Sequence, residues 1–293
     1  MKAETVRKMK WGVERRYEFI EFRLYWEGRI NRADLTTVFG ISTPQASMDL
    51  NAYIKDAPNN LSYDKSAKTY VRGKKFKARY FRPDPEEYFA QLSAIHFGLV
   101  SSEQSWIKTV PHVDATPRPE RDVDSEILRE FLSAIRERVA LLIVYQSMST
   151  AEPSRRVIEP HAFASDGFRW HVRAYSQKDE EFRDFVLSRV REIIDHKDCV
   201  SSPEQDLDWS TEIILEIAPH PHLSPQQSAV IQQDYGMVKG SKKIPVRKAL
   251  VFYALQQMRL DPRYGENPLG QQIVLLNATD VLNEINMANE WGC

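Results

Sequence analysis

A proline-rich break is the feature that most limits how this chain can fold. Residues 109–124, TVPHVDATPRPERDVD, contain Pro111, Pro117 and Pro119 and almost no apolar periodicity. Proline fixes φ and has no N–H, so neither a helix nor a central strand is expected to run through this stretch. The 293 residues allow two or three domains, and we expect residues 111–138 to hold a linker and the helix that follows it.

Beyond the break, apolar residues recur at the spacing of an amphipathic helix. The five that define its apolar face are Ile127, Leu128, Phe131, Leu132 and Ile135. We expect this helix, together with the C-terminal region, to contribute to a dimer interface.

Charge is distributed unevenly along the chain. Residues 1–82 contain 18 Lys and Arg against 9 Asp and Glu, whereas the remainder contains 22 against 32. A basic end on an acidic body predicts a polyanionic partner, although a solvated basic face would give the same count. The N-terminus lacks the apolar region of a secretory signal, and no apolar run is long enough to span a membrane. We therefore expect a cytoplasmic protein with no membrane partner.

Residues 1–110 have the pattern of a winged helix-turn-helix with appended helices. A first helix is expected at 11–26, and a short second helix ends at Gly40, where glycine easily adopts left-handed backbone. A third helix is expected to begin after Ser42, with Pro44 in its first turn. The stretch LSYDKSAKTYVRG that follows predicts a β-hairpin, the wing.

Small polar side chains at the start of the third helix suit the major groove of DNA. Gln and Asn can bond bidentately to adenine, and basic residues on a wing suit phosphates. A protein-interaction module built from three helices and a hairpin is the alternative. The expected DNA-contacting residues are Ser42, Thr43, Gln45, Ser47 and Asn51 on the helix, with Lys65, Lys68 and Arg72 on the wing.

A second pattern lies in SDGFRWHVRAY, residues 165–175. Successive residues of a strand point to opposite faces, so the stretch separates into an apolar row and a cationic row. The apolar row, which we expect in the core, is Phe168, Trp170, Val172 and Ala174; the cationic row is Arg169, His171 and Arg173. The cationic row either faces a ligand or forms an inter-domain salt-bridge network. Several short strands between 139 and 195 predict a small barrel.

Residues 155–193 resemble the WYL domain of bacterial regulators. The resemblance rests on Trp170-His171-Val172 in place of the Trp-Tyr-Leu triplet, on Arg156 to Pro160, and on the strand from Phe185 to Val190. The wider stretch is similar to one branch, the BrxR/CapW-type regulators of phage-defence islands. This resemblance implies an α+β multidomain protein with a winged helix-turn-helix, a central Sm-like, SH3-type barrel at 139–203 and a C-terminal α/β dimerisation domain at 204–293.

The resemblance also implies a function: a ligand-responsive, homodimeric repressor of a phage-defence locus. It would bind an inverted-repeat DNA operator and, through the barrel, an anionic nucleotide-like or nucleic-acid effector. Arg suits phosphate because its planar fork makes bidentate bonds. The candidate effector residues are Tyr145, Ser147, Arg156, His161, Arg169, His171, Arg173 and Arg189. The alternative is an Sm-like accessory protein that binds RNA or single strands, but the predicted inward direction of the aromatic row argues against a stacking platform.

Other chemistry has little support in the sequence. There is no phosphate-binding P-loop and no nucleophile elbow. Cys199 and Cys293 fit no metal spacing, and no carboxylate or cysteine set completes a zinc site with His220 and His222. We expect no enzyme activity, no catalytic residues, no metal and no cofactor.

Overall fold

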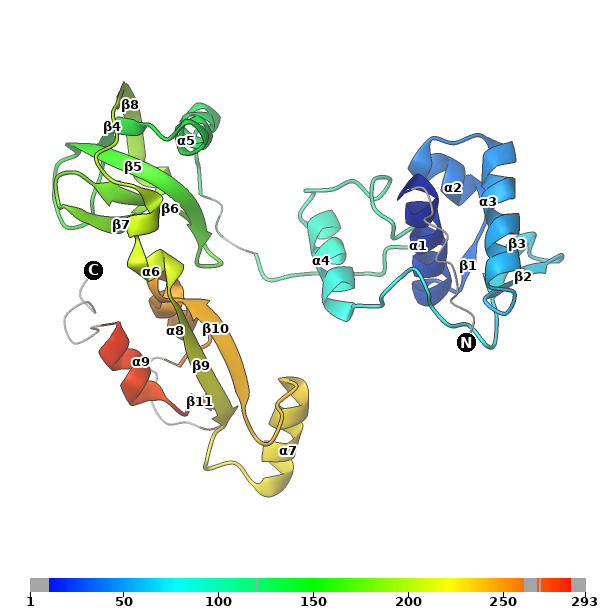
Figure 1. Ribbon diagram of the computed structural model, residues 1–293. Coiled ribbons are helices and arrows are strands. Elements are labelled where there is room, and N and C mark those ends of the chain that lie inside the picture. Colours follow the sequence, from blue (N-terminus) through cyan, green and yellow to red (C-terminus); the bar gives the residue numbers. More distant parts are fainter. Residues whose placement is uncertain (1–10, 118, 120, 261–267, 269, 286–293) are drawn as a thin grey trace, which may run out of the picture. The chain divides into compact units, whose positions relative to one another are not determined.

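The computed structural model describes residues 11–117, 119, 121–260, 268 and 270–285. The chain forms two compact units, residues 1–117 and 118–293 (Figure 1). Cys293 and the end of the expected C-terminal domain lie outside the described residues. No helix in the described ranges is long and apolar enough to cross a membrane.

The three helices expected in the first unit are confirmed. They are α1 (Trp11–Trp26), α2 (Arg32–Phe39) and α3 (Thr43–Asp56). Asn31 and Asp34 form a reciprocal capping box at the start of α2, which ends at Gly40 with φ of 62°. The Ser42 side chain accepts from the N–H of Gln45 and caps α3. Local signals therefore fix both ends of the turn between α2 and α3.

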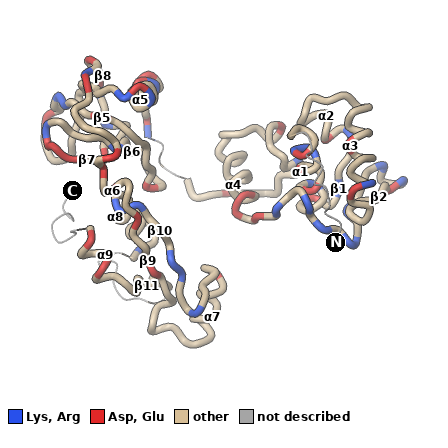
Figure 2. Tube along the Cα trace, viewed as in Figure 1, with Lys and Arg blue, Asp and Glu red and all other residues tan. Residues whose placement is uncertain are grey.

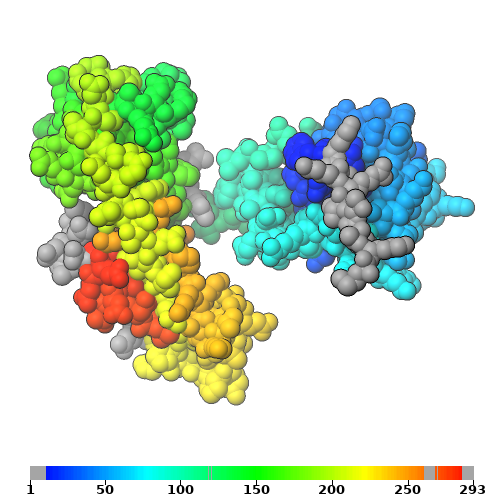
Figure 3. Space-filling model, in the orientation of Figure 1, coloured from blue at the N-terminus to red at the C-terminus, as the bar shows by residue number. Residues whose placement is uncertain are grey.

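A three-stranded antiparallel sheet forms the wing, in the order β1-β3-β2. Its strands are β1 (Arg29–Ile30), β2 (Leu61–Asp64) and β3 (Thr69–Arg72). The predicted hairpin is β2 and β3, and it projects as a narrow lobe from the surface of its unit (Figure 3). The sequence did not predict β1, because two residues are too short to show alternation. The appended helix is α4 (Pro85–His96).

A buried carboxylate fixes the basic segment that follows the wing. Glu21 of α1 is fully buried and accepts from the N–H groups of Arg79, Tyr80 and Phe81 at 2.7–2.9 Å. It also accepts from the hydroxyl of Tyr53 on α3, at 2.7 Å. A carboxylate can be buried when hydrogen bonds of this kind replace its water. This one side chain therefore ties α1, α3 and the chain after the wing together.

The second unit begins with α5 (Ser125–Glu137) and a five-stranded antiparallel sheet in the order β7-β6-β5-β4-β8. The strands are β4 (Ala140–Tyr145), β5 (Ser154–Ser165), β6 (Trp170–Ser176), β7 (Glu181–Val186) and β8 (Val190–Lys197). The closed barrel expected from the sequence is not confirmed. The sheet is open, because no ladder joins β7 to β8 in the described residues. The predicted single strand from 185 is broken by the 3-10 turn Leu187–Arg189.

The core of this sheet corrects the expected apolar row. Val172 and Ala174 are fully buried, as predicted, but Phe168 is 67% exposed and Trp170 is 59% exposed. Phe168 precedes β6 and Trp170 is its first residue. Both lie where the sheet ends, and no other described residue covers them. Alternation assigns residues to one face of a strand but does not show how far the core extends along it.

The helix α5 is confirmed, but its predicted single apolar face divides in two. Phe131 and Ala134 are fully buried against the sheet, with Ile127 packed beside them. Leu128 and Leu132 remain exposed. The second pair lies one turn apart on a face that the sheet does not cover.

The C-terminal region packs a second antiparallel sheet, in the order β10-β9-β11, with short helices. Its elements are α6 (Leu207–Ser210), β9 (Glu212–Pro219), α7 (Pro225–Asp234), β10 (Lys242–Arg247), α8 (Val251–Gln257), β11 (Ile273–Leu275) and α9 (Ala278–Glu284). The strands β9 and β11 and the helices α7 and α8 were predicted. The strand β10, which contains Pro245, was not predicted. The proline is tolerated because β10 is an edge strand.

Candidate nucleic-acid interface and effector site

One face of α3 is buried and the other is open. Ala46, Leu50 and Tyr53 are fully buried in the core of the first unit. Thr43 and Asn51 are exposed on the other side, as expected from the sequence. Their side chains make no hydrogen bond within the described part of the chain, so they remain available to a partner.

Gln45 is held in one orientation by a buried carboxylate. Its Nε2 donates to Oδ1 of Asp49 at 2.9 Å, one helical turn along α3. Asp49 is buried and also accepts from Nε of Arg16 on α1 at 2.6 Å. One amide hydrogen of Gln45 is thereby used, and its oxygen and second amide hydrogen remain to face a base. The sequence indicated Gln45 but not Asp49 and Arg16, because their pairing spans 33 residues.

Two residues at the open side of α3, Met48 of α3 and Arg32 of α2, were not among the expected DNA-contacting residues. Met48 is 65% exposed. The guanidinium of Arg32, at the start of α2, reaches Oγ of Ser47 at 3.5 Å, and that Oγ donates to the carbonyl of Thr43 at 2.9 Å. Ser47 is therefore already occupied, whereas Arg32 places a positive charge beside α3. Its position directly after the cap of α2 is a signal that the sequence analysis could have used.

The wing carries two of its three predicted cations at its tip. Lys65 and Lys68 are exposed in the turn that joins β2 and β3, where Figure 2 shows the basic positions. Arg72 lies over the rings of Tyr25 and Phe76, with its guanidinium carbon 5.3 and 4.9 Å from their centroids. The tip is therefore free for phosphates, and Arg72 also packs against its own unit.

Two of the three residues of the cationic row, those on β6, are buried, whereas the Arg169 side chain is 29% exposed. His171 is 2% exposed and Arg173 is 6% exposed. Arg173 makes a bidentate pair with Asp206, from Nε at 2.7 Å and Nη2 at 3.0 Å. Its Nη1 also contacts Asp184 at 3.3 Å. Burial alone would raise the pKa of the Asp206 carboxyl, but hydrogen bonds from His161 and Arg173 outweigh it and hold that pKa well below its usual value.

The neighbouring cations are paired as well. Nε2 of His161 lies 2.9 Å from Asp206, and Asp166 contacts both Nε of Arg169 at 2.9 Å and Nε2 of His171 at 3.1 Å. Tyr253 of α8 donates to Asp184 at 3.0 Å, and its ring lies 4.9 Å from the ring of His171. These contacts join the sheet to the C-terminal region. They correspond to the salt-bridge network that the sequence left open as the alternative to a ligand-facing row.

The other four candidate effector residues lie near the end of β4. The guanidinium carbon of Arg156 on β5 is 5.6 Å from the ring centroid of Tyr145, and its closest carboxylate, Asp179, is 3.7 Å away. Arg189 precedes β8, on the other side of β4, and has no ion-pair partner among the described residues. Ser147 lies two residues after Tyr145, and its hydroxyl is hydrogen-bonded to the hydroxyl of Ser149 at 2.7 Å. These cations are held less firmly than Arg173.

Three family models match the chain in the order that the sequence predicted. The winged helix-turn-helix domain of the BrxR transcriptional regulator matches residues 12–94. The WYL domain matches residues 126–194, and the C-terminal dimerization domain of the BrxR regulator matches residues 212–281. Together with the open face of α3, these matches define a winged-helix transcriptional regulator of the WYL class and not an enzyme.

The particular family follows from whole-length similarity. A protein of Stenotrophomonas maltophilia named DNA-binding transcriptional repressor CapW is 37% identical over 284 residues, covering 96% of this chain and 95% of that protein. Proteins of the same name from Escherichia coli (strain KTE188) and Pseudomonas aeruginosa are 39% and 37% identical, each over 93% of this chain and 91% of the relative. The chain belongs to the CapW family.

Proposed function

We propose that this protein is a homodimeric, sequence-specific repressor that binds an inverted-repeat operator. The observation that carries the proposal is the polar, uncovered face of α3 beside a basic wing, on a chain whose relatives are named DNA-binding repressors. Helix α3 enters the major groove, and the half-sites lie about one helical turn of roughly 34 Å, or a multiple of it, apart. The protein acts in the cytoplasm, where bacterial DNA lies.

The side chains divide between sequence readout and affinity. Gln45 and Asn51 contact base edges, with Thr43 and Ser42 at the helix start. Lys65 and Lys68 contact phosphates, which supply salt-dependent affinity without sequence choice. Arg32 adds a further cation beside α3.

Dimerisation is assigned to residues 204–293 and to α5. The match to a C-terminal dimerization domain supports the first, and the exposed pair Leu128 and Leu132 supports the second. An exposed apolar pair on an otherwise packed helix suits a second copy of the chain. Residues 1–110 form the DNA-binding domain, 111–138 the connection and 139–203 the sensor domain.

The sensor sheet binds an anionic, nucleotide-like or nucleic-acid effector, and the regulated gene lies in a phage-defence locus. Of the candidate residues, Ser147, Arg156 and Arg189 are the better site. Tyr145 is 6% exposed and its hydroxyl accepts from the N–H of Val186 at 3.1 Å, so it supports Arg156 from the core. Taking phosphate at Arg173 would require breaking its bidentate bond to Asp206. The effector changes DNA affinity only by binding one arrangement of the dimer more tightly than another.

The first experiment is a gel-shift titration of the full chain. It compares DNA from upstream of the protein's own gene with a shuffled duplex, at two salt concentrations. We expect selective binding that persists at the higher salt. Equal binding to both duplexes, lost as salt rises, would mean phosphate contacts alone and would contradict the proposal.

A second experiment tests the effector site. A short 5′-phosphorylated oligonucleotide is titrated into the protein–operator complex. The double variant Arg156→Ala with Arg189→Ala should keep operator binding and lose the response to the oligonucleotide. Arg155→Ala is the matched control, because Arg155 is exposed next to Arg156 and was not assigned to the site. A response that survives the double variant contradicts the assignment.

One observation favours a second function. Phe168 and Trp170 are exposed and flank Arg169, so they form the kind of aromatic and cationic surface on which single-stranded bases stack. Under this alternative the sheet binds RNA or single-stranded DNA as its main activity. Trp170→Ala would then weaken single-strand binding while leaving operator binding unchanged.

A further inference from the structure

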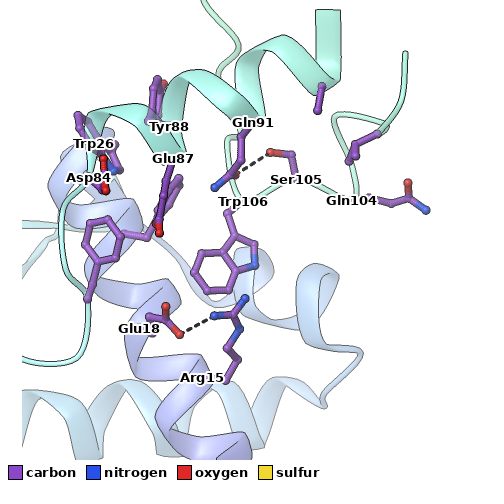
Figure 4. Close-up of a pocket in the computed structure, with 14 residues that line it drawn as sticks. Arg15, Glu18, Trp26, Asp84, Glu87, Tyr88, Gln91, Gln104, Ser105 and Trp106 are labelled. Atoms are coloured by element: carbon purple, nitrogen blue, oxygen red, sulfur yellow. Dashed lines mark hydrogen bonds and ion pairs between the residues drawn. The ribbon is translucent and has the colours of Figure 1, made fainter. Parts of the chain in front are cut away.

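The first unit contains a cavity on the side of α1 that carries Arg15 and Glu18. It has a volume of about 290 Å³ and lies between α1, α4 and the segment that ends at Trp106 (Figure 4). This volume is close to the lower end of the range for small-molecule sites. None of the DNA-contacting or effector residues discussed above lines it, so the cavity is independent of the proposed function.

Aromatic rings form much of the cavity wall. The ring centroids of Trp26 and Tyr88 are 4.6 Å apart, and those of Phe22 and Trp106 are 5.5 Å apart. The indole Nε1 of Trp26 is buried and has no hydrogen-bond partner in the described part of the chain. A buried donor without a partner is costly, and a water molecule in the cavity that accepts from it would remove that cost, so this donor does not select the charge of a ligand.

The wall is also acidic. Glu18, Asp84 and Glu87 contribute three carboxylates against the single cation Arg15. Nη1 of Arg15 is already paired with Glu18 at 2.6 Å. Glu87 has no ion-pair partner among the described residues. A cavity with an excess of carboxylates attracts cations and repels phosphates.

One part of the wall already holds a cation in the manner expected of a ligand. The guanidinium carbon of Arg15 lies 4.1 Å from the ring centroid of Trp106, with Glu18 as its counter-ion. Aromatic faces attract cations through the ring quadrupole. A second part of the wall also combines aromatic rings, Trp26 and Tyr88, with carboxylates, Asp84 and Glu87. No arginine or lysine of the described residues lies over these two rings.

We propose that this cavity binds a small organic cation, with an ammonium or amidinium head at Glu87 and Asp84 and a flat or apolar body against Trp26, Tyr88 and Trp106. Such a ligand differs in charge from the anionic effector proposed for the sheet of the second unit. The DNA-binding unit would thus carry a ligand site of its own.

The test uses two probes of the same shape and opposite charge, benzamidine and benzoate. Each is titrated into the full chain by calorimetry, up to about 10 mM, which is tenfold above the roughly 1 mM dissociation constant expected of so small a ligand. We expect benzamidine to bind and benzoate not to bind. Equal binding of both probes, or binding of neither, overturns the proposal.

The site is located with a matched pair of variants on α4. Glu87→Gln should weaken benzamidine binding about three- to fivefold, the effect of losing one exposed ion pair. Glu86→Gln should leave it unchanged, because Glu86 is also exposed in the first turn of α4 but does not line the cavity. Both variants remove one charge near the same helix start, so their effects on α4 itself match. Equal weakening by both variants, or by neither, would place the probe elsewhere.

Discussion

The pairing of Asp206 with Arg173 allows a quantitative prediction. Asp206 is 1% exposed and accepts three side-chain contacts, two from Arg173 and one from His161. In Asp206→Ala, Arg173 keeps only Asp184, at 3.3 Å. Removing one partner of a buried ion pair costs about 3–5 kcal/mol, because the remaining charge stays desolvated. The second unit should lose about this much stability.

Asp208→Ala is the control, two residues along the chain. Asp208 pairs with Lys248 at 2.8 Å, but both side chains are partly exposed. Exposed pairs contribute only about 0–1 kcal/mol. Asp206 also caps α6 through the N–H of Trp209, so Asp206→Asn, which can still accept that bond, separates loss of charge from loss of the cap.

Hydrogen exchange of the β6 backbone is the suitable assay, because it reports on the second unit alone. A loss of about 3–5 kcal/mol corresponds to exchange that is faster by about two to four powers of ten. The reasoning is refuted if Asp206→Ala and Asp208→Ala exchange at similar rates, since Arg173 would then not depend on its carboxylate.

Three further predictions concern other parts of the molecule. Gln45→Ala with Asn51→Ala should abolish preference for the operator over a shuffled duplex in gel shifts while salt-dependent binding remains; unchanged preference would contradict the role of α3. Gly73→Ala should lower the stability of the first unit by about 1–3 kcal/mol in denaturant unfolding, because the new Cβ would lie 2.0 Å from the carbonyl oxygen of Asn59; Gly12→Ala, with 3.5 Å of clearance, should not destabilise it. Burial raises the pKa of Asp166, but hydrogen bonds from His171 and from backbone N–H groups outweigh it and lower that pKa to about 2. The charged carboxyl thus stabilises the fold above about pH 4, and this contribution disappears as the pH falls through 2, so Asp166→Asn should show a shallower loss of stability over that interval.

Local signals in the sequence were sufficient for helices α1 to α3 and the β2–β3 hairpin of the first unit, although not for the two-residue strand β1. Caps at Ser42 and Asn31 and the left-handed Gly40 set the helix ends through neighbours within four residues, so their effect can be read from the chain directly. The candidate base-contacting face of α3 followed from the same periodicity. What the sequence could not show was that Asp49 and Arg16 hold Gln45, because that contact depends on how α1 packs on α3.

The cationic row of β6 shows the opposite case. Alternation correctly separated Arg173 from Val172, but both sides of the strand turned out to be buried. The covering residues, Asp206 and Tyr253, lie 33 and 80 residues further along the chain, and no local pattern links them to β6. The sequence therefore indicated which residues share a face and not what lies against that face.

Glu21 has a consequence for how this DNA-binding unit can diversify. It holds the segment after the wing through three backbone N–H groups, at residues 79, 80 and 81. Every amino acid except proline supplies that group, so the path of the segment does not depend on which side chains it carries. Exposed residues of the segment such as Arg79 can therefore be exchanged without losing the attachment, provided that the glutamate on α1 is kept.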